Sequence, residues 1–174
     1  MKIVAIIQAR MGSTRLENKV MKLINSKPII EFLLMRLAKS KFIDQIVVAT
    51  PKDKKNLPII NHVKKLGFSC EQGSENDVLE RYLQVAKNNE ADVIVRITGD
   101  CPFVDPVLVD KCIDKFLKSD VDYCSNVNPP TFPDGLDVEV IKYNALKKAS
   151  EHTNNKFDRE HVTTFILNSE DFSK

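Results

Sequence analysis

A regular alternation of short apolar runs with amphipathic segments over the first 120 residues constrains the fold of this chain more than any other feature. The runs that indicate buried strands lie at residues 3–7, 46–50, 68–70 and 93–98. Apolar side chains recur at helical spacing in residues 28–40, 58–65, 78–86 and 106–118. This order predicts an α/β fold, in which a doubly wound, mostly parallel sheet carries helices on both faces.

The last third of the chain is less regular. Strands are indicated at residues 122–126 and 138–141, and helices at residues 144–152 and from Asp158, which is predicted to cap the last one. Between the two strands, residues 127–135 contain three prolines and one glycine, which is typical of a long irregular connection. Ser26 and Asp105 are predicted to cap earlier helices. At 174 residues we expect one domain, residues 1–174.

Composition excludes several classes of protein. A net charge of +2 is too small for general nucleic-acid binding, and no apolar run approaches the ~20 residues of a membrane span. The four cysteines are widely spaced without a Cys-x-x-Cys pair, so we expect free thiols and no zinc site. The first strand begins at once, without a basic and apolar leader. A cytoplasmic protein without membrane insertion is therefore expected.

A polar loop at residues 8–20 follows the first predicted strand directly. It places three cations around a glycine and two hydroxyl residues: Arg10, Arg15 and Lys19, with Gly12, Ser13 and Thr14. Glycine lets a backbone approach an anion closely, successive N–H groups can form an anion-binding nest, and arginines bind phosphate oxygens in pairs. The pattern is neither a Walker A loop nor a dinucleotide fingerprint. It predicts a polyphosphate site, with an ordinary solvated basic loop as the alternative.

Asp100 follows Gly99 at the end of the strongest predicted strand. A carboxylate there suits Mg²⁺, which proteins usually hold with one or two carboxylates and substrate phosphates. The alternative is a simple turn, where both residue types are common. Because carboxyl ends of parallel strands meet at one sheet edge, we expect Asp100 to face the polar loop.

Three further stretches carry candidate residues. Ser74, Asp77 and Arg81 lie in a polar loop and the helix after it, where a helix cap and a solvated face are the alternatives. Asp137 and Glu139, two residues apart on a predicted strand, point to one face. His161 lies in an Arg-Glu-His-Val-Thr run, and a packed helical histidine is the alternative.

The loop sequence resembles that of nucleotidyltransferases that activate sugars. Among these it is most similar to the cytidylyltransferases acting on acidic sugars, the acylneuraminate and 3-deoxy-octulosonate enzymes and especially the spore-coat-polysaccharide type. The matching residues are Gln8, Ala9, Arg10, Gly12, Ser13, Arg15, Leu16 and Lys19. Glu17 and Asn18 replace the usual Pro and Gly, and Asn18 can adopt the left-handed conformation that such a turn requires.

The resemblance implies a Rossmann-like nucleotide-sugar transferase fold and a role for each matching position. The expected catalytic residues are Arg15, Lys19 and Asp100. The expected nucleotide-binding residues are Gln8, Ala9, Arg10, Gly12, Ser13, Arg15, Lys19, Ser74, Asp77, Arg81 and Asp100. Mg²⁺ is the expected cofactor, with Asp100 and Asp137 as ligands, and Glu139 and His161 are expected substrate contacts.

The function that follows is a Mg²⁺-dependent transfer of CMP from CTP to a sugar, an acidic one by resemblance, for surface polysaccharide or glycan synthesis. Two alternatives stay open: another nucleoside triphosphate such as GTP, and a nucleotide-binding assembly module without turnover. Family members commonly pair, so a homodimer is expected, with residues 127–143 as its arm. The resemblance also implies that this chain covers only part of the family domain, lacking its C-terminal portion.

Overall fold

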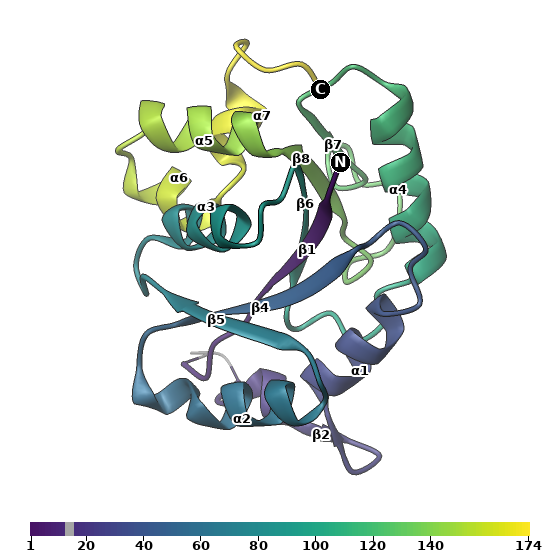
Figure 1. Cartoon of the computed structure of the whole chain (residues 1–174), viewed down its shortest axis with the longest axis vertical. Coiled ribbons are helices and arrows are strands. Elements are labelled where there is room, and N and C mark those ends of the chain that lie inside the picture. Colours follow the sequence, from purple (N-terminus) through teal and green to yellow (C-terminus); the bar gives the residue numbers. More distant parts are fainter. Residues whose placement is uncertain (13–15) are drawn as a thin grey trace.

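Within residues 1–12 and 16–174, which the computed structural model describes, six strands form one central sheet in the order β5-β4-β1-β6-β8-β7 (Figure 1). The strands are β1 (Ile3–Gln8), β4 (Gln45–Pro51), β5 (Ser69–Gly73), β6 (Val93–Thr98), β7 (Tyr123–Ser125) and β8 (Glu139–Lys142). The first four pair in parallel, whereas β8 is antiparallel to both β6 and β7. The prediction of a doubly wound, mostly parallel sheet is confirmed.

Helices cover both faces of this sheet. They are α1 (Ile29–Leu37), α2 (Leu57–Lys65), α3 (Val78–Asn88), α4 (Pro106–Lys118), α5 (Tyr143–His152), α6 (Lys156–His161) and α7 (Thr164–Asn168). Short 3-10 turns η1 (Lys19–Met21) and η2 (Lys54–Asn56) and a hairpin of β2 (Leu23–Ile24) and β3 (Lys27–Pro28) complete the described elements. None of the described helices combines the length and the apolar character needed to cross a bilayer.

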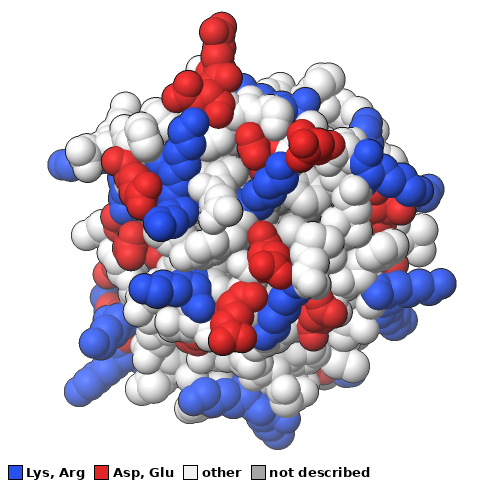
Figure 2. All heavy atoms as spheres, turned by 45° about the horizontal axis from the view of Figure 1, so that its top comes forward, with Lys and Arg blue, Asp and Glu red and all other residues white. Residues whose placement is uncertain are grey.

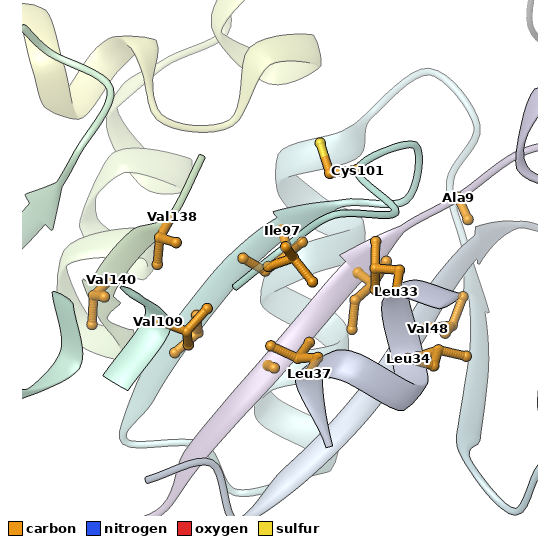
Figure 3. Close-up of a cluster of buried hydrophobic side chains, with 14 of the residues drawn as sticks. Ala9, Leu33, Leu34, Leu37, Val48, Ile97, Cys101, Val109, Val138 and Val140 are labelled. Carbon is orange, nitrogen blue, oxygen red and sulfur yellow. The ribbon is translucent and has the colours of Figure 1, made fainter. Parts of the chain in front are cut away.

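The period-two alternation of β1 divides the core into two clusters. Ile3, Ala5 and Ile7 pack with α1, α2 and α4, whereas Val4 and Ile6 pack with α3, α5 and α7. Figure 1 shows α3, α5 and α6 together on one side of the sheet and α1 and α2 on the other. Figure 3 shows the first cluster, in which the leucines of α1 lie against the sheet residues Ile97 and Val48.

Only some of the predicted helix caps are confirmed. Asp105 caps α4 as predicted, because its Oδ1 accepts hydrogen bonds from the N–H groups of Val107 and Leu108 at 2.8 and 2.9 Å. Ser26 is no cap, since α1 begins after Pro28 and Ser26 occupies the hairpin turn with φ 67°. Asp158 is also not a cap: Asn155 caps α6, and the predicted last helix is divided into α6 and α7.

The point where the strand order reverses lies between β1 and β6. From β1 the chain adds β4 and β5 on one side and then crosses to β6 on the other, so a crevice opens at the carboxyl ends of β1 and β6. Gln8 and Thr98 are paired at these ends. A Cβ on Gly99 would lie 2.7 Å from the carbonyl oxygen of Gln8, so glycine is what permits this close approach. The next residue, Asp100, is thereby placed beside the polar loop.

One buried side chain, that of Asn126, holds the two ends of the connection between β7 and β8 together. Asn126 donates to the carbonyl of Leu136 at 2.8 Å and accepts from the N–H of Val138 at 2.8 Å. The irregular segment therefore returns to the sheet edge from which it leaves, and residues 139–142 of the predicted arm belong to β8. Whether the segment contacts a second protomer stays a prediction.

Candidate functional site

A cleft of about 620 Å³ opens at the switch point, between the N-terminus of α3 and α6. Five cations and three carboxylates are among its lining residues, so the wall favours an anionic ligand. The lining comprises Gln8, Ala9, Arg10, Glu75, Asn76, Asp77, Val78, Arg81, Arg96, Lys156, Arg159, Glu160 and His161. On the face shown in Figure 2, by contrast, basic and acidic side chains are interspersed.

The polar loop is held at both of its described ends. The N–H of Met11 donates to Oδ1 of Asn56, a side chain only 3% exposed, at 3.0 Å, and the N–H of Asn18 donates to the carbonyl of Met11 at 3.3 Å. Asn18 has φ 56° and ψ 28°, which confirms the left-handed turn expected of it. Two predicted site residues, Ser13 and Arg15, lie outside the described residues.

Lys19 and Asp100 meet as an ion pair at the edge of the sheet. Burial raises the pKa of Asp100, but the hydrogen bonds from Lys19 and Thr98 outweigh it and hold the pKa below its ordinary value. Asp100 is therefore an ionised carboxylate that already binds a cation, here an ammonium group. The prediction that the polar loop and Asp100 share one sheet edge is confirmed.

Two more carboxylates act on the turn that follows β6. Burial raises the pKa of the Cys101 thiol, the hydrogen bond with Thr98 lowers it, and the charges of Asp100, Asp137 and Asp134 raise it. The pKa of Asp137 is itself raised, first by burial and then by Asp134 and Glu139. The described residues contain no group of three or more His, Cys, Asp or Glu side chains arranged to hold a metal. Carboxylates such as Asp100 and Asp137 are the oxygen ligands with which proteins hold Mg²⁺ together with phosphates and water.

Ser74 and Asp77 organise the start of α3. Asp77 accepts from the N–H of Glu80 at 2.9 Å, which caps the helix, and its other oxygen pairs with the guanidinium of Arg159 at 2.6 Å. Ser74 Oγ accepts from the N–H of Asp77 at 3.1 Å. Asp77 is thus confirmed as the helix cap, whereas Ser74 closes the turn before it, and Asp77 also lines the cleft.

Arg81 lies on the cleft floor and is only 3% exposed. It donates to the carbonyl of Ser74, and its side chain crosses Gly73, where a Cβ would lie 2.8 Å from Arg81 Cγ. Burial lowers the pKa of Arg81, and the charge of Arg10 lowers it further. Among the described residues, no Asp or Glu oxygen lies within 4.0 Å of Arg81, so a buried guanidinium faces this end of the cleft without a carboxylate partner.

The two predicted substrate contacts take different places. His161 lines the cleft and stacks on Phe157, with ring centroids 4.3 Å apart. Glu139 is buried at 5% exposure and lies behind Arg96, with which it forms an ion pair, so it does not line the cleft. The lining of the cleft also excludes Asp100, Lys19, Gly12 and Ser74.

Arg96 and Arg159 were not among the predicted site residues, although both line the cleft. Arg96 had a visible signal, because an arginine within an otherwise apolar strand needs a polar partner when buried. Arg159 belongs to the Arg-Glu-His-Val-Thr run, but its ion-pair partner Asp77 lies 82 residues away, so this contact had no local signal. Lys156 and Glu160 accompany it on the short helix α6.

Comparison with known proteins gives one consistent result. A family model described as cytidylyltransferase matches residues 4–172. An uncharacterized protein of Methanocaldococcus jannaschii, MJ1063, is 44% identical over 174 residues, which cover all of this chain and 70% of that protein. The spore coat polysaccharide biosynthesis protein SpsF of Bacillus subtilis is 39% identical over 173 residues, covering 95% and 70%.

More distant sequences and solved structures agree. The 3-deoxy-manno-octulosonate cytidylyltransferase of Geotalea daltonii is 34% identical over 115 residues, covering 65% of this chain and 44% of the enzyme. A solved cytidylyltransferase from Leptospira borgpetersenii serovar Hardjo-bovis superposes with a TM-score of 0.94 at 37% identity, covering 99% of this chain and 74% of that one.

Proposed function

The chain belongs to the cytidylyltransferase family, and from this premise we propose that it transfers CMP from CTP to an acidic sugar, releasing pyrophosphate. The product would serve surface polysaccharide or glycan synthesis. One observation carries the proposal: a cationic cleft lies at the switch point of the sheet, with the Lys19–Asp100 pair at its edge. Polyphosphate binding needs cations on a rigid frame, and both ends of the described loop are anchored.

The polar loop supplies the triphosphate end in this proposal. Arg10, Arg15 and Lys19 hold the β- and γ-phosphates, and Gly12 and Ser13 offer backbone and hydroxyl donors. Among the described residues, no atom lies within 4 Å of a Cβ built on Gly12, so the space there is open. Lys19, which forms an ion pair with Asp100, would turn to the phosphates when CTP binds. Asp100 and Asp137 would hold Mg²⁺, which offsets phosphate charge and polarises the α-phosphate.

The chemical step is an in-line displacement. A sugar hydroxyl oxygen forms a bond to the α-phosphorus and gives up its proton to water, the bond from the α-phosphorus to the bridging oxygen breaks, and the pyrophosphate leaves with the electron pair of that bond. The protein contributes positioning and stabilisation of negative charge more than covalent chemistry. Arg15 and Lys19 stabilise the departing pyrophosphate, and Asp100 is the third catalytic residue.

The cleft itself holds the remaining parts of the two substrates. Gln8 and Ala9 at the end of β1, with Ser74, Asp77 and Arg81 around the start of α3, form the nucleotide side. His161 on α6 contacts the sugar. Asp77 acts through its ion pair with Arg159, which ties α6 to α3 and thereby sets the width of the cleft.

The test is a turnover and binding panel with purified protein. We expect pyrophosphate release with Mg²⁺, CTP and an acidic sugar, and a loss of it when EDTA is added. Thermal shift should show stabilisation by Mg²⁺–CTP above that by UTP, GTP or ATP, because a ligand that binds only the native state raises its stability. Turnover with GTP would support the other-nucleotide alternative. CTP binding without pyrophosphate release across the sugar panel would support the non-catalytic module.

A further inference from the structure

Glu139 is a buried carboxylate at the start of β8 to which three side chains from different parts of the chain donate. The hydroxyl groups of Tyr123 and Thr163 each donate to Oε1 at 2.7 Å, and the guanidinium of Arg96 pairs with Oε2. Both carboxylate oxygens are therefore occupied within the protein. A carboxylate held in this way does not bind substrate directly but fixes the group that it pairs with.

Arg96 is that group, and it faces the cleft. It extends from β6, lines the cleft, and keeps 15% of its side chain exposed. One terminal nitrogen pairs with Glu139 and the other donates to Oε1 of Gln8 at 3.3 Å. The guanidinium also lies over the ring of Tyr82, 5.9 Å from its centroid. Arg96 is thus oriented from three sides while part of it remains open to a ligand.

Arg96 also has a buried nitrogen without a hydrogen-bond partner among the described residues. In the part of the chain that the structure describes, three buried side-chain atoms lack a hydrogen-bond partner: Nε of Arg81, the hydroxyl of Tyr82 and Nε of Arg96. Tyr82 is fully buried and Arg81 is 3% exposed. Unpaired buried polar atoms are uncommon and call for an explanation, and Arg96, which keeps part of its guanidinium side chain exposed, can take a further acceptor from a ligand.

The sheet order separates two of these cations. Arg81 crosses Gly73 at the end of β5, on one side of β1, whereas Arg96 lies on β6, next to β8, on the other side. The polar loop follows β1, which lies between the positions of Arg81 and Arg96. If Arg81 serves the nucleotide, Arg96 and His161 are left to serve the second substrate.

We propose that Arg96 is the specificity-determining residue for the second substrate, whose carboxylate it binds, and that Glu139 is a positioning residue that holds Arg96 in place. The inference rests on the function proposed above and names the group that selects an acidic sugar. A carboxylate suits this wall better than a phosphate dianion, because Glu139 already offsets part of the charge of Arg96 and Glu160 also lines the cleft.

The variants Arg96→Lys and Arg96→Gln test whether Arg96 binds the carboxylate of the second substrate. The probes are 3-deoxy-manno-octulosonate and N-acetylneuraminate, each compared with its neutral carboxamide. We expect both variants to keep the affinity for Mg²⁺–CTP within about threefold, while KM for the acid that the wild type uses rises about 10- to 100-fold, as for loss of a charge-assisted contact. The rise should be smaller for Lys than for Gln. Arg36→Gln is the matched control, because Arg36 donates to Val104 on the opposite face of the sheet.

Glu139→Gln tests the second part. A positioning role predicts that KM for the acid rises while kcat and CTP affinity change little, and that Glu139→Asp recovers part of the loss. The wild type should prefer the acid over its carboxamide, and Glu139→Gln should weaken that preference. Breaking one partner of a buried pair can unfold a protein. The double variant Arg96→Gln/Glu139→Gln replaces the pair by two neutral amides, and it should fold and show the same selective loss.

The outcomes separate the two proposals. A wild type that binds Mg²⁺–CTP but treats acid and carboxamide alike, or that uses a hexose 1-phosphate instead, overturns the inference and leaves nucleotidyl transfer standing. An unchanged KM in a folded Arg96→Gln variant overturns it as well. A wild type that binds no CTP and releases no pyrophosphate contradicts the proposed function itself.

Discussion

Lys19 and Asp100 lie 81 residues apart and form an ion pair at the sheet edge. Burial alone raises the pKa of Asp100, whereas the hydrogen bonds from Lys19 and Thr98 bring it below the ordinary value. The lowered pKa favours the ionised carboxylate. The same pairing means that a ligand cation and a ligand anion must each displace one partner.

The first prediction for single residues concerns how the stability of the protein depends on pH. A depressed carboxyl pKa stabilises the fold above the unfolded-state pKa of about 3.9, and that contribution is lost as the pH falls through the lower folded-state pKa. Lys19→Met removes the partner that lowers the pKa of Asp100. We expect the variant to have a lower Tm near neutral pH and the gap to close below about pH 4. A gap of constant size from pH 3 to 7 would show that the loss is packing and not charge.

The carboxyl ends of strands β1 and β6 approach each other closely because the residue after β6 is Gly99. A Cβ at this position would lie 2.7 Å from the carbonyl oxygen of Gln8 and 3.0 Å from the Cβ of Ala9. Since one neighbour is backbone, relief requires the ends of both strands to move apart. The Lys19–Asp100 pair depends on this spacing.

We therefore expect Gly99→Ala to lower stability by about 1–3 kcal/mol, as for other overpacked sites. It should also weaken Mg²⁺–CTP binding. Chemical denaturation and calorimetry measure the two effects. Gly12→Ala is the control for stability, because its Cβ meets no atom within 4 Å and its φ is not positive. Equal stability of the two variants would contradict the close-approach argument.

The molecule as a whole is organised by the reversal of strand order beside β1. One crevice results, and it collects residues from the first loop, the start of α3, β6 and α6. The irregular segment between β7 and β8 lies outside this arrangement. Its Phe132 is 46% exposed, an unusual position for an aromatic side chain without a partner.

The prediction for the whole molecule is that it forms a homodimer. We expect light scattering to give twice the 19.8 kDa of the chain, and Phe132→Asp to give a folded monomer, because the charge would oppose burial of this segment against a partner. Circular dichroism checks that the variant is folded. A monomeric mass for the wild type at high protein concentration would rule out the arm.

The sequence by itself determined the parallel α/β sheet, the polar loop after its first strand and the edge that this loop shares with Asp100. These follow from local information: β-branched runs and helical spacing define elements, and in a doubly wound sheet the carboxyl ends of strands meet. Asn18 belongs here too, since its left-handed turn depends on its own residue type and its neighbours.

Only the tertiary structure decided which side chains face the ligand. Glu139 and Arg96 are both charged residues on strands, yet the first is buried behind the second because they pair across adjacent strands β8 and β6. Arg159 reaches the cleft through a partner 82 residues away. Such contacts depend on strand order and on helix docking, which no local pattern encodes, so the basic wall of the cleft emerges only when the whole chain is folded.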